Sequence, residues 1–334
     1  MDTQPSNGVL EDFRLEFSRC WSRLPNKGAF LLLSAAWVGL FHFLGNSTLG
    51  YVNSPSLFGF LSDAFGVGRR GLLESEEGYA VFVPIVVAAL FWHKRKELLQ
   101  LDLGSWRPGL LILAGGTMLH ILGYAVQQPR FSVIGFFIGL YGIMGTLWGL
   151  NWLRGCFFPF LLFGFCVPLG SLAEPITFRL RLMVSSLVGF VSHYLLAIDV
   201  IVQGNMLIDP TGHYQYEVAA ACSGIHSLIA TTALALVVAF LCLQNPWKRL
   251  IMILSAVPLA VLGNLIRMMA IIIAAECGGQ SLGAYVHDGG PLGLLSLLPY
   301  VPAFVGLLIL ERYLRPPSGS ASASCVQPLK FKET

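Results

Sequence analysis

Long apolar stretches recur along the whole chain, and they constrain its fold more than any other feature of the sequence. A helix needs roughly 20 mostly apolar residues to cross a bilayer. Eight stretches meet or approach that length: 28–46, 79–93, 109–126, 131–150, 155–172, 224–243, 249–275 and 291–311. Only 12% of the residues are charged, about half the ~25% of an ordinary soluble domain. This composition predicts a polytopic membrane protein and excludes a soluble enzyme, a disordered chain or a small disulfide-rich domain.

Basic residues between the apolar stretches indicate the orientation of the chain, because cytoplasmic loops are enriched in Lys and Arg. The stretch 176–198 is apolar overall but carries Arg179 and Arg181, and counting it as a ninth span would place Lys248 and Arg249 outside. We therefore expect 176–198 to be an amphipathic helix at the outer interface, with its arginines among the lipid headgroups. Both termini are then cytoplasmic. The basic residues expected on the cytoplasmic side are Arg14, Arg19, Arg23, Lys27, Lys94, Arg95, Lys96, Arg107, Arg154, Lys248, Arg249, Arg312 and Arg315.

The expected fold is an all-α polytopic membrane protein with about eight transmembrane helices, the outer interfacial helix and a small β-hairpin. The hairpin is predicted at 199–221, where short apolar strands flank a turn at 209–212. The chain divides into a cytoplasmic amphipathic segment at 1–27, a four-helix transmembrane region at 28–150, a second transmembrane region at 151–315 and a disordered cytoplasmic tail at 316–334.

Small residues are regularly spaced in the fourth expected span. Gly135 and Gly139, and likewise Gly145 and Gly149, are four positions apart. This spacing allows helices in a membrane to approach closely. We therefore expect these glycines to serve helix packing, and they are only a remote indication of function.

Three reactive side chains are expected at the outer ends of separate spans. Cys222 precedes the span 224–243, Arg267 lies near the outer end of the span 249–275, and His287 lies in the loop before the last span. A thiolate nucleophile needs a proton acceptor and a nearby positive charge, and acyl transfer needs hydrogen-bond donors for the developing oxyanion. The set suggests a cysteine transpeptidase or protease, although spacing alone does not decide it.

Each of these residues also has a purely structural explanation. A cysteine in an apolar run is usually a small hydrophobic residue, and a histidine in an outer loop is usually solvated. Arg267 can extend to the headgroups, but an arginine inside a span costs at least ~2.5–3.5 kcal/mol and usually marks function. The seven cysteines form no CxxC and no Cys/His cluster with the spacing of zinc ligands, so no metal or cofactor is expected.

The sequence around these three residues resembles that of a known family. Residues 217–225, EVAAACSGI, resemble the ACSGI motif of the exosortase/archaeosortase family, and residues 264–267, NLIR, match its NxxR motif. His287 follows at the expected place, so the order Cys, Arg, His is that of the family. The resemblance covers roughly residues 150–311 and marks 151–315 as a catalytic core.

The resemblance implies a membrane-embedded transpeptidase or protease at the outer face of a bacterial inner membrane. Its expected partners are secreted proteins with a C-terminal PEP-CTERM-like tail, which comprises a short motif, an apolar span and a basic cluster. Cys222 would form a thioester with the substrate, His287 would transfer protons and Arg267 would stabilise the oxyanion. An acceptor amine or water would then release the product. Membrane lipid surrounds the chain, and the small net charge of +3 gives no sign of a nucleic-acid partner.

The sequence departs from the family pattern at two positions. Many relatives carry Arg after SGI, where this chain has His226, and often Glu where it has Ala220. His226 is four residues after Cys222 and so on the same helical face. It can compete with His287 as the base, contact the substrate motif or bond to a neighbouring helix.

Three further polar residues are candidates for supporting roles. Asn264 lies one helical turn before Arg267, where it can orient the guanidinium or form an interhelical hydrogen bond. Glu217 and Asp288 flank the site in the sequence and can orient His287 or bind a nucleophilic amine.

Two non-enzymatic functions compete with the peptidase. One is a polytopic transporter or channel, in which Arg267 lines a path through the membrane. The chain has no internal duplication and no matched pair of Gly/Pro-broken helices, which many transporters have. The other is a non-catalytic scaffold for polysaccharide or protein export.

Overall fold

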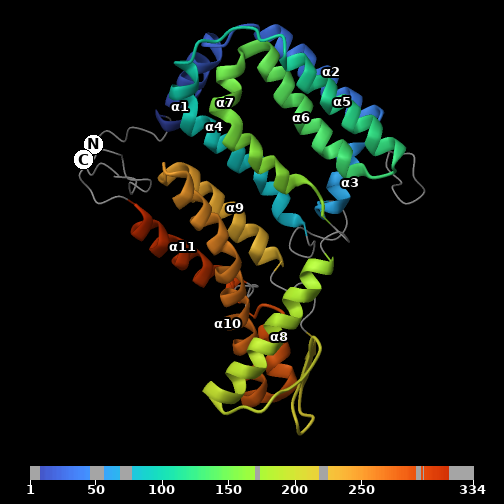
Figure 1. Cartoon of the computed structure of the whole chain (residues 1–334), viewed down its shortest axis with the longest axis vertical. Coiled ribbons are helices and arrows are strands. Elements are labelled where there is room, and N and C mark those ends of the chain that lie inside the picture. Colours follow the sequence, from blue (N-terminus) through green and yellow to red (C-terminus); the bar gives the residue numbers. More distant parts are fainter. Residues whose placement is uncertain are drawn as a thin grey trace, which may run out of the picture. The chain divides into compact units, whose positions relative to one another are not determined.

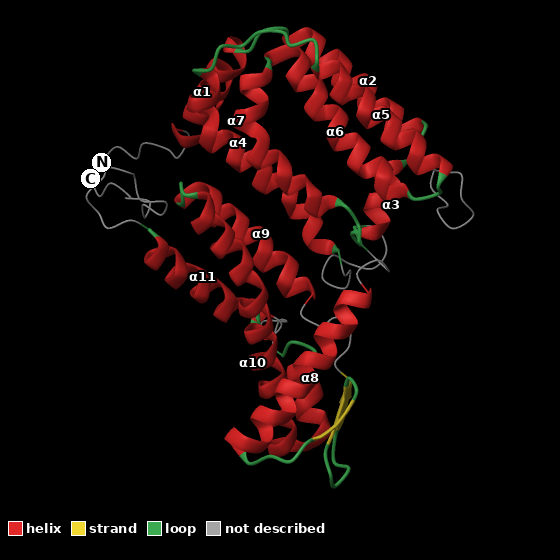
Figure 2. Ribbon diagram, in the orientation of Figure 1, coloured by secondary structure: helices red, strands yellow, loops and turns green. Residues whose placement is uncertain are grey.

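A computed structural model of the chain describes residues 8–45, 56–67, 77–169, 174–217, 225–290, 295 and 297–315. These residues are mostly helical, with one small antiparallel sheet (Figures 1 and 2). The chain forms two compact units, Met1–Leu169 and Gly170–Thr334.

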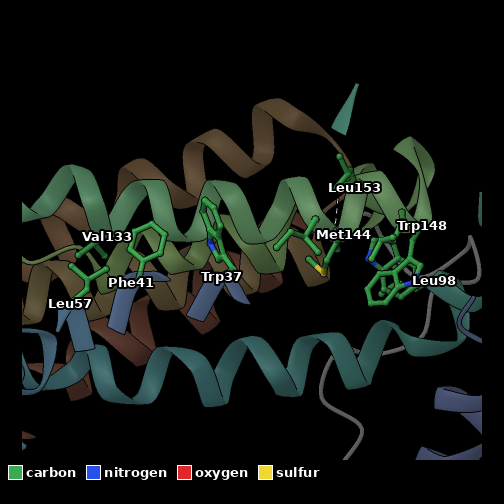
Figure 3. Close-up of a cluster of buried hydrophobic side chains, with 12 residues drawn as sticks. Trp37, Phe41, Leu57, Leu98, Val133, Met144, Trp148 and Leu153 are labelled. Carbon is green, nitrogen blue, oxygen red and sulfur yellow. Dashed lines mark hydrogen bonds between the residues drawn. The ribbon is translucent and has the colours of Figure 1, made fainter. Parts of the chain in front are cut away.

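The first unit is helical throughout its described part. Two apolar rings of α2, Trp37 and Phe41, and Trp148 of α6 belong to one buried cluster that follows the length of α6 (Figure 3). The α6 helix starts at Pro129, where the missing N–H of proline costs no hydrogen bond. The elements are α1 (Gly8–Arg23), α2 (Lys27–Phe43), α3 (Leu57–Ala64), η1 (Gly78–Phe82), α4 (Val83–Leu99), α5 (Gly109–Ala125), α6 (Pro129–Trp148), α7 (Leu150–Leu161) and η2 (Leu162–Cys166).

Glycines bring α5 and α6 into backbone contact. A Cβ atom on Gly116 of α5 would lie 2.7 Å from both the carbonyl oxygen of Gly135 and the amide nitrogen of Gly139. On the α2 side, a Cβ on Gly139 would overlap the indole ring of Trp37. The expectation that Gly135 and Gly139 serve helix packing is therefore confirmed.

In its described part, the second unit combines four helices with the sheet. The strand order is β1-β2-β3, and all pairs are antiparallel. Leu207 in the central strand is opposite Val202 on one side and Tyr216 on the other. The hairpin expected at 199–221 is thus a three-stranded sheet in its described part. The elements are α8 (Glu174–Leu196), β1 (Ile201–Gln203), β2 (Met206–Ile208), β3 (Gln215–Glu217), α9 (Ile225–Cys242), α10 (Pro246–His287) and α11 (Tyr300–Leu314).

Fewer helices than expected meet the length and hydropathy of a complete span. Within the described residues these are α6 and α10, and a third if α1 and α2, bent by 96°, count as one span. Three further apolar helices are shorter: Gly109–Ala125, Leu150–Cys166 and Ser227–Cys242. The expectation of about eight spans is therefore not confirmed, because several apolar stretches form helices of 17 residues or fewer.

The α8 helix is amphipathic, but its two arginines lie in different environments. Arg179 is exposed, whereas Arg181 is only 8% exposed. Arg181 shares a helical face with Val184 and Val188, which pack against α10 in a buried cluster. The expectation that both arginines lie among headgroups is wrong for Arg181, because that face of the helix is turned into the protein. The opposite face exposes Phe190 and Tyr194.

Replacing Gly116 with Leu should destabilise the first unit. The side chain has no space between α5 and α6, so we expect the free energy of unfolding to fall by about 1–3 kcal/mol. The matched control is Gly115→Leu, since a Cβ on Gly115 meets no atom within 4 Å. Thermal unfolding of the detergent-solubilised protein measures the difference, and equal melting temperatures for the two variants would contradict the close packing.

Candidate functional site

The long helix α10 reverses its direction at two glycines. Gly278 and Gly279 have non-helical backbone angles, and the φ of 71° and ψ of −171° at Gly279 belong to a region that other residues rarely adopt. The chain after the reversal returns along α10, since a Cβ on Gly283 would lie 3.0 Å from the Cβ of Ala275. We had expected the apolar span to end at 275 and a loop to follow.

The reversal joins two of the predicted site residues. In an uninterrupted helix, Arg267 and His287 would be roughly 30 Å apart at 1.5 Å per residue. Instead, Nη2 of Arg267 donates a hydrogen bond to the main-chain oxygen of His287 at 3.1 Å. His287 is the last residue of α10, and not part of a free loop.

Arg267 keeps hydrogen-bonding capacity for a ligand. Its side chain is half-buried, and its Nε is buried without a hydrogen-bond partner among the described residues. A guanidinium carries five N–H donors in a planar fork. Tyr300, the first residue of α11, is within electrostatic range of this guanidinium. The arginine therefore holds the end of α10 with one nitrogen and has further donors for an anionic group.

His287 contacts the carboxylate that follows it in the sequence. Its Nδ1 is 3.1 Å from Oδ1 of Asp288. A carboxylate at Nδ1 favours the tautomer with the proton on that nitrogen and makes Nε2 the basic one. The Asp288 side chain is 78% exposed, so solvent weakens the ion pair that forms when His287 is protonated.

Asn264 is placed for contact between helices. It is only 2% exposed, and it borders a small gap together with Val184 of α8 and Leu228 of α9. The neighbouring Gly263 touches the chain before α11, because a Cβ there would lie 2.0 Å from the carbonyl oxygen of Pro299. This close approach brings Tyr300 toward Arg267.

The third strand of the sheet is bonded to the reversal of α10. The side-chain amide of Gln280 accepts from the N–H of Gln215 at 2.9 Å and donates to its carbonyl oxygen at 3.2 Å, as a neighbouring strand would. The hydroxyl of Tyr216 donates to the main-chain oxygen of Gln280 at 3.0 Å. The end of β3 is therefore held against the same turn that positions His287.

A second tyrosine strengthens this attachment. The hydroxyl of Tyr214 donates to Oε1 of Glu276 at 2.9 Å. Burial, followed by the bond to Glu276, raises the pKa of Tyr214, so the hydroxyl keeps its proton at all physiological pH values. Glu217 at the end of β3 accepts from the side-chain amide of Asn205 at 3.0 Å, and its bond is therefore to the β1–β2 turn instead of to His287.

The side chains of two predicted site residues lie outside the part of the chain that the structure describes. Cys222 belongs to 218–224, outside the described residues, and the side chain of His226 is likewise not described. This segment connects β3, which is bonded to α10, with α9, which begins at Ile225.

Several residues that build the site were not predicted from the sequence. These are Tyr214, Tyr216, Glu276, Gln280 and Tyr300. The pair Gly278–Gly279 was the available signal, because two glycines at the end of an apolar run favour a break in a helix. Among the described residues, no group of three or more His, Cys, Asp or Glu is arranged to hold a metal ion.

Fold and site together define a helical membrane protein with an arginine and a histidine joined at the end of a long apolar helix. A model of the transmembrane exosortase family (Exosortase_EpsH) matches residues 72–309, well over half of the chain. The chain therefore belongs to the exosortase family. No curated protein and no solved structure gives a significant match.

Replacing Gln280 with Leu should loosen β3. The variant loses both hydrogen bonds to the main chain of Gln215. The free energy of local opening should therefore fall by about 1 kcal/mol, which corresponds to roughly fivefold faster amide exchange in 215–217. Hydrogen exchange followed by mass spectrometry measures the rate. The control is Gln203→Leu, an exposed glutamine of β1, and similar rates in both variants would count against the attachment.

Proposed function

We propose that this protein is a membrane cysteine peptidase or transpeptidase that cleaves C-terminal sorting signals of secreted proteins. It is a member of a family of membrane cysteine transpeptidases that process sorting signals. The observation that carries the proposal is the hydrogen bond from Arg267 to the main chain of His287. It joins the arginine of the NxxR motif to the histidine that follows it in the family order.

In the proposed reaction, the thiol of Cys222 gives its proton to His287, and its Sγ attacks the backbone carbonyl carbon at the sorting motif. The tetrahedral oxyanion accepts hydrogen bonds from the N–H groups of Arg267 that do not bond to His287. His287, oriented by Asp288, protonates the leaving amine, and the C–N bond breaks to leave a thioester on Cys222. An amine or water, deprotonated by His287, attacks the thioester and restores the thiol. No cofactor takes part.

The contacts of β3 support the participation of Cys222. The segment that carries the cysteine starts at β3, which Gln280 and Tyr216 bond to the reversal of α10. It ends at α9, which packs along α10. Both flanking elements are thus attached to the helix that carries Arg267 and His287. Asn264, buried one turn before Arg267, is proposed to hold α10 against α8 and α9.

We place the site at the periplasmic face of the bacterial inner membrane. The basic residues between the apolar stretches support about eight spans with both termini in the cytoplasm. The exposed Phe190 and Tyr194 of α8 suit an interfacial helix. The substrates are secreted proteins with PEP-CTERM-like tails, whose apolar helix would present the scissile bond at the depth of Arg267.

Substitution of Cys222 tests the proposal. Without the thiol, no thioester forms, so Cys222→Ala should lower processing by a factor of roughly 10³ or more. The measurement compares C-terminal peptides of membrane and secreted proteins from cells with either form of the protein. Cys277→Ala, which removes an exposed free cysteine, should leave processing unchanged. Indistinguishable peptides in wild type and Cys222→Ala would favour a transporter or an export scaffold.

Arg267→Lys should damage the reaction although it preserves the charge. Lysine lacks the planar donor fork, and loss of an oxyanion donor typically costs about 10²–10³ in kcat. We expect a fall of this size with little change in KM, measured on a peptide that contains the sorting motif. Arg179→Lys on the exposed face of α8 is the control. Near-normal kcat in Arg267→Lys would exclude the oxyanion role.

A further inference from the structure

An open cavity of about 460 Å³ lies in the first unit, bordered by α1, α2, α4, α6, α7 and η2. One face of α4 forms its longest wall. The buried cluster of Figure 3 adjoins it through Leu98, Met144 and Trp148. None of the residues that line the cavity belongs to the candidate active site.

The walls of this cavity are almost entirely aliphatic and aromatic. Apart from tryptophan N–H groups, Cys20 and Arg95 are the only lining residues with a polar side-chain group. Water needs two to four polar partners to remain in a cavity, and an empty space would leave the lining atoms without dispersion contacts. Pockets of this size and character in proteins bind apolar molecules. The occupant is therefore apolar over most of its length.

The few polar groups in the wall are hydrogen-bond donors. Three of the five N–H groups of Arg95 donate, two to Glu16 and one to the main-chain oxygen of Trp92. Two remain. The occupant must therefore bring acceptors to at least one end.

The two helices that meet at Arg95, α1 and α4, carry an excess of basic residues, and the charged partner of Arg95 itself is Glu16. Arg19 and Arg23 of α1 and Lys94 and Lys96 of α4 are sequence neighbours of lining residues. In residues 8–27 and α4 together, seven basic residues stand against four acidic ones. Such clusters attract anionic lipid headgroups.

We propose that the cavity binds one acyl chain of an anionic phospholipid, with the phosphate at Arg95 and the chain along α4. The bound chain completes the packing between α1 and α4. That packing otherwise depends on the ring contacts of Phe13 and Phe17 with Trp92 and on the ion pair of Arg95 with Glu16. The site is independent of the proposed peptidase activity.

A variant that fills the cavity tests whether the cavity binds an acyl chain. The full-length protein is purified in detergent, stripped of lipid and titrated with phosphatidylglycerol under native mass spectrometry. Both Ala88 and the adjacent Ala89 of α4 are exposed, but only Ala88 lines the cavity. We expect wild type and Ala89→Phe to retain one lipid, and Ala88→Phe to show at least tenfold lower occupancy at the same lipid concentration.

The same titration with phosphatidylcholine of identical chains tests the headgroup. Wild type should favour phosphatidylglycerol about tenfold, and Arg95→Gln should lose this preference. Arg107→Gln, which removes an exposed arginine outside α1 and α4, should keep it. Equal occupancy in Ala88→Phe and Ala89→Phe, equal binding of the two lipids, or retention of detergent alone would overturn the proposal. Higher lipid occupancy after deletion of 316–334 would also overturn it, because the tail of the chain would then be the occupant.

Discussion

The second unit depends on the reversal of α10 at Gly278 and Gly279. Only this turn allows a guanidinium halfway along the helix to bond to the main chain at its end. The arginine is half-buried in an apolar helix, and the bond satisfies part of its demand for acceptors. The turn also provides Gln280, whose amide acts as a fourth strand beside β3. One irregularity in one helix thus organises the arginine, the histidine and the sheet.

The first unit follows another principle, in which small and large residues alternate. Gly116, Gly135 and Gly139 let α5 and α6 touch, and Trp37 occupies the space that a side chain at Gly139 would need. Within the bilayer, such packing replaces the hydrophobic effect as the source of helix association. Beside α4, where large aromatic rings of several helices meet, the packing leaves the cavity that we assign to a lipid chain.

Local sequence predicted the elements better than their ends and directions. The sheet was predicted at 199–221 as a small hairpin of short apolar strands around turn residues, and the helices were predicted from apolar stretches. Arg181 was misplaced because the pattern of α8 shows two faces without telling which one meets protein and which meets lipid. The reversal in α10 was missed because the limb after Gly279 is short, and a short segment between two apolar spans favours a loop over a helix.

The sequence by itself determined the membrane character, the packing role of the glycines and the family, because these depend on composition and on residues at short spacing. The tertiary structure alone decided that Arg267 bonds to His287, that β3 is held by Gln280 and that Glu217 pairs with Asn205. These contacts join residues 12 to 65 positions apart. A long-range contact depends on where the chain turns in space, and a helical or strand pattern carries no record of that direction.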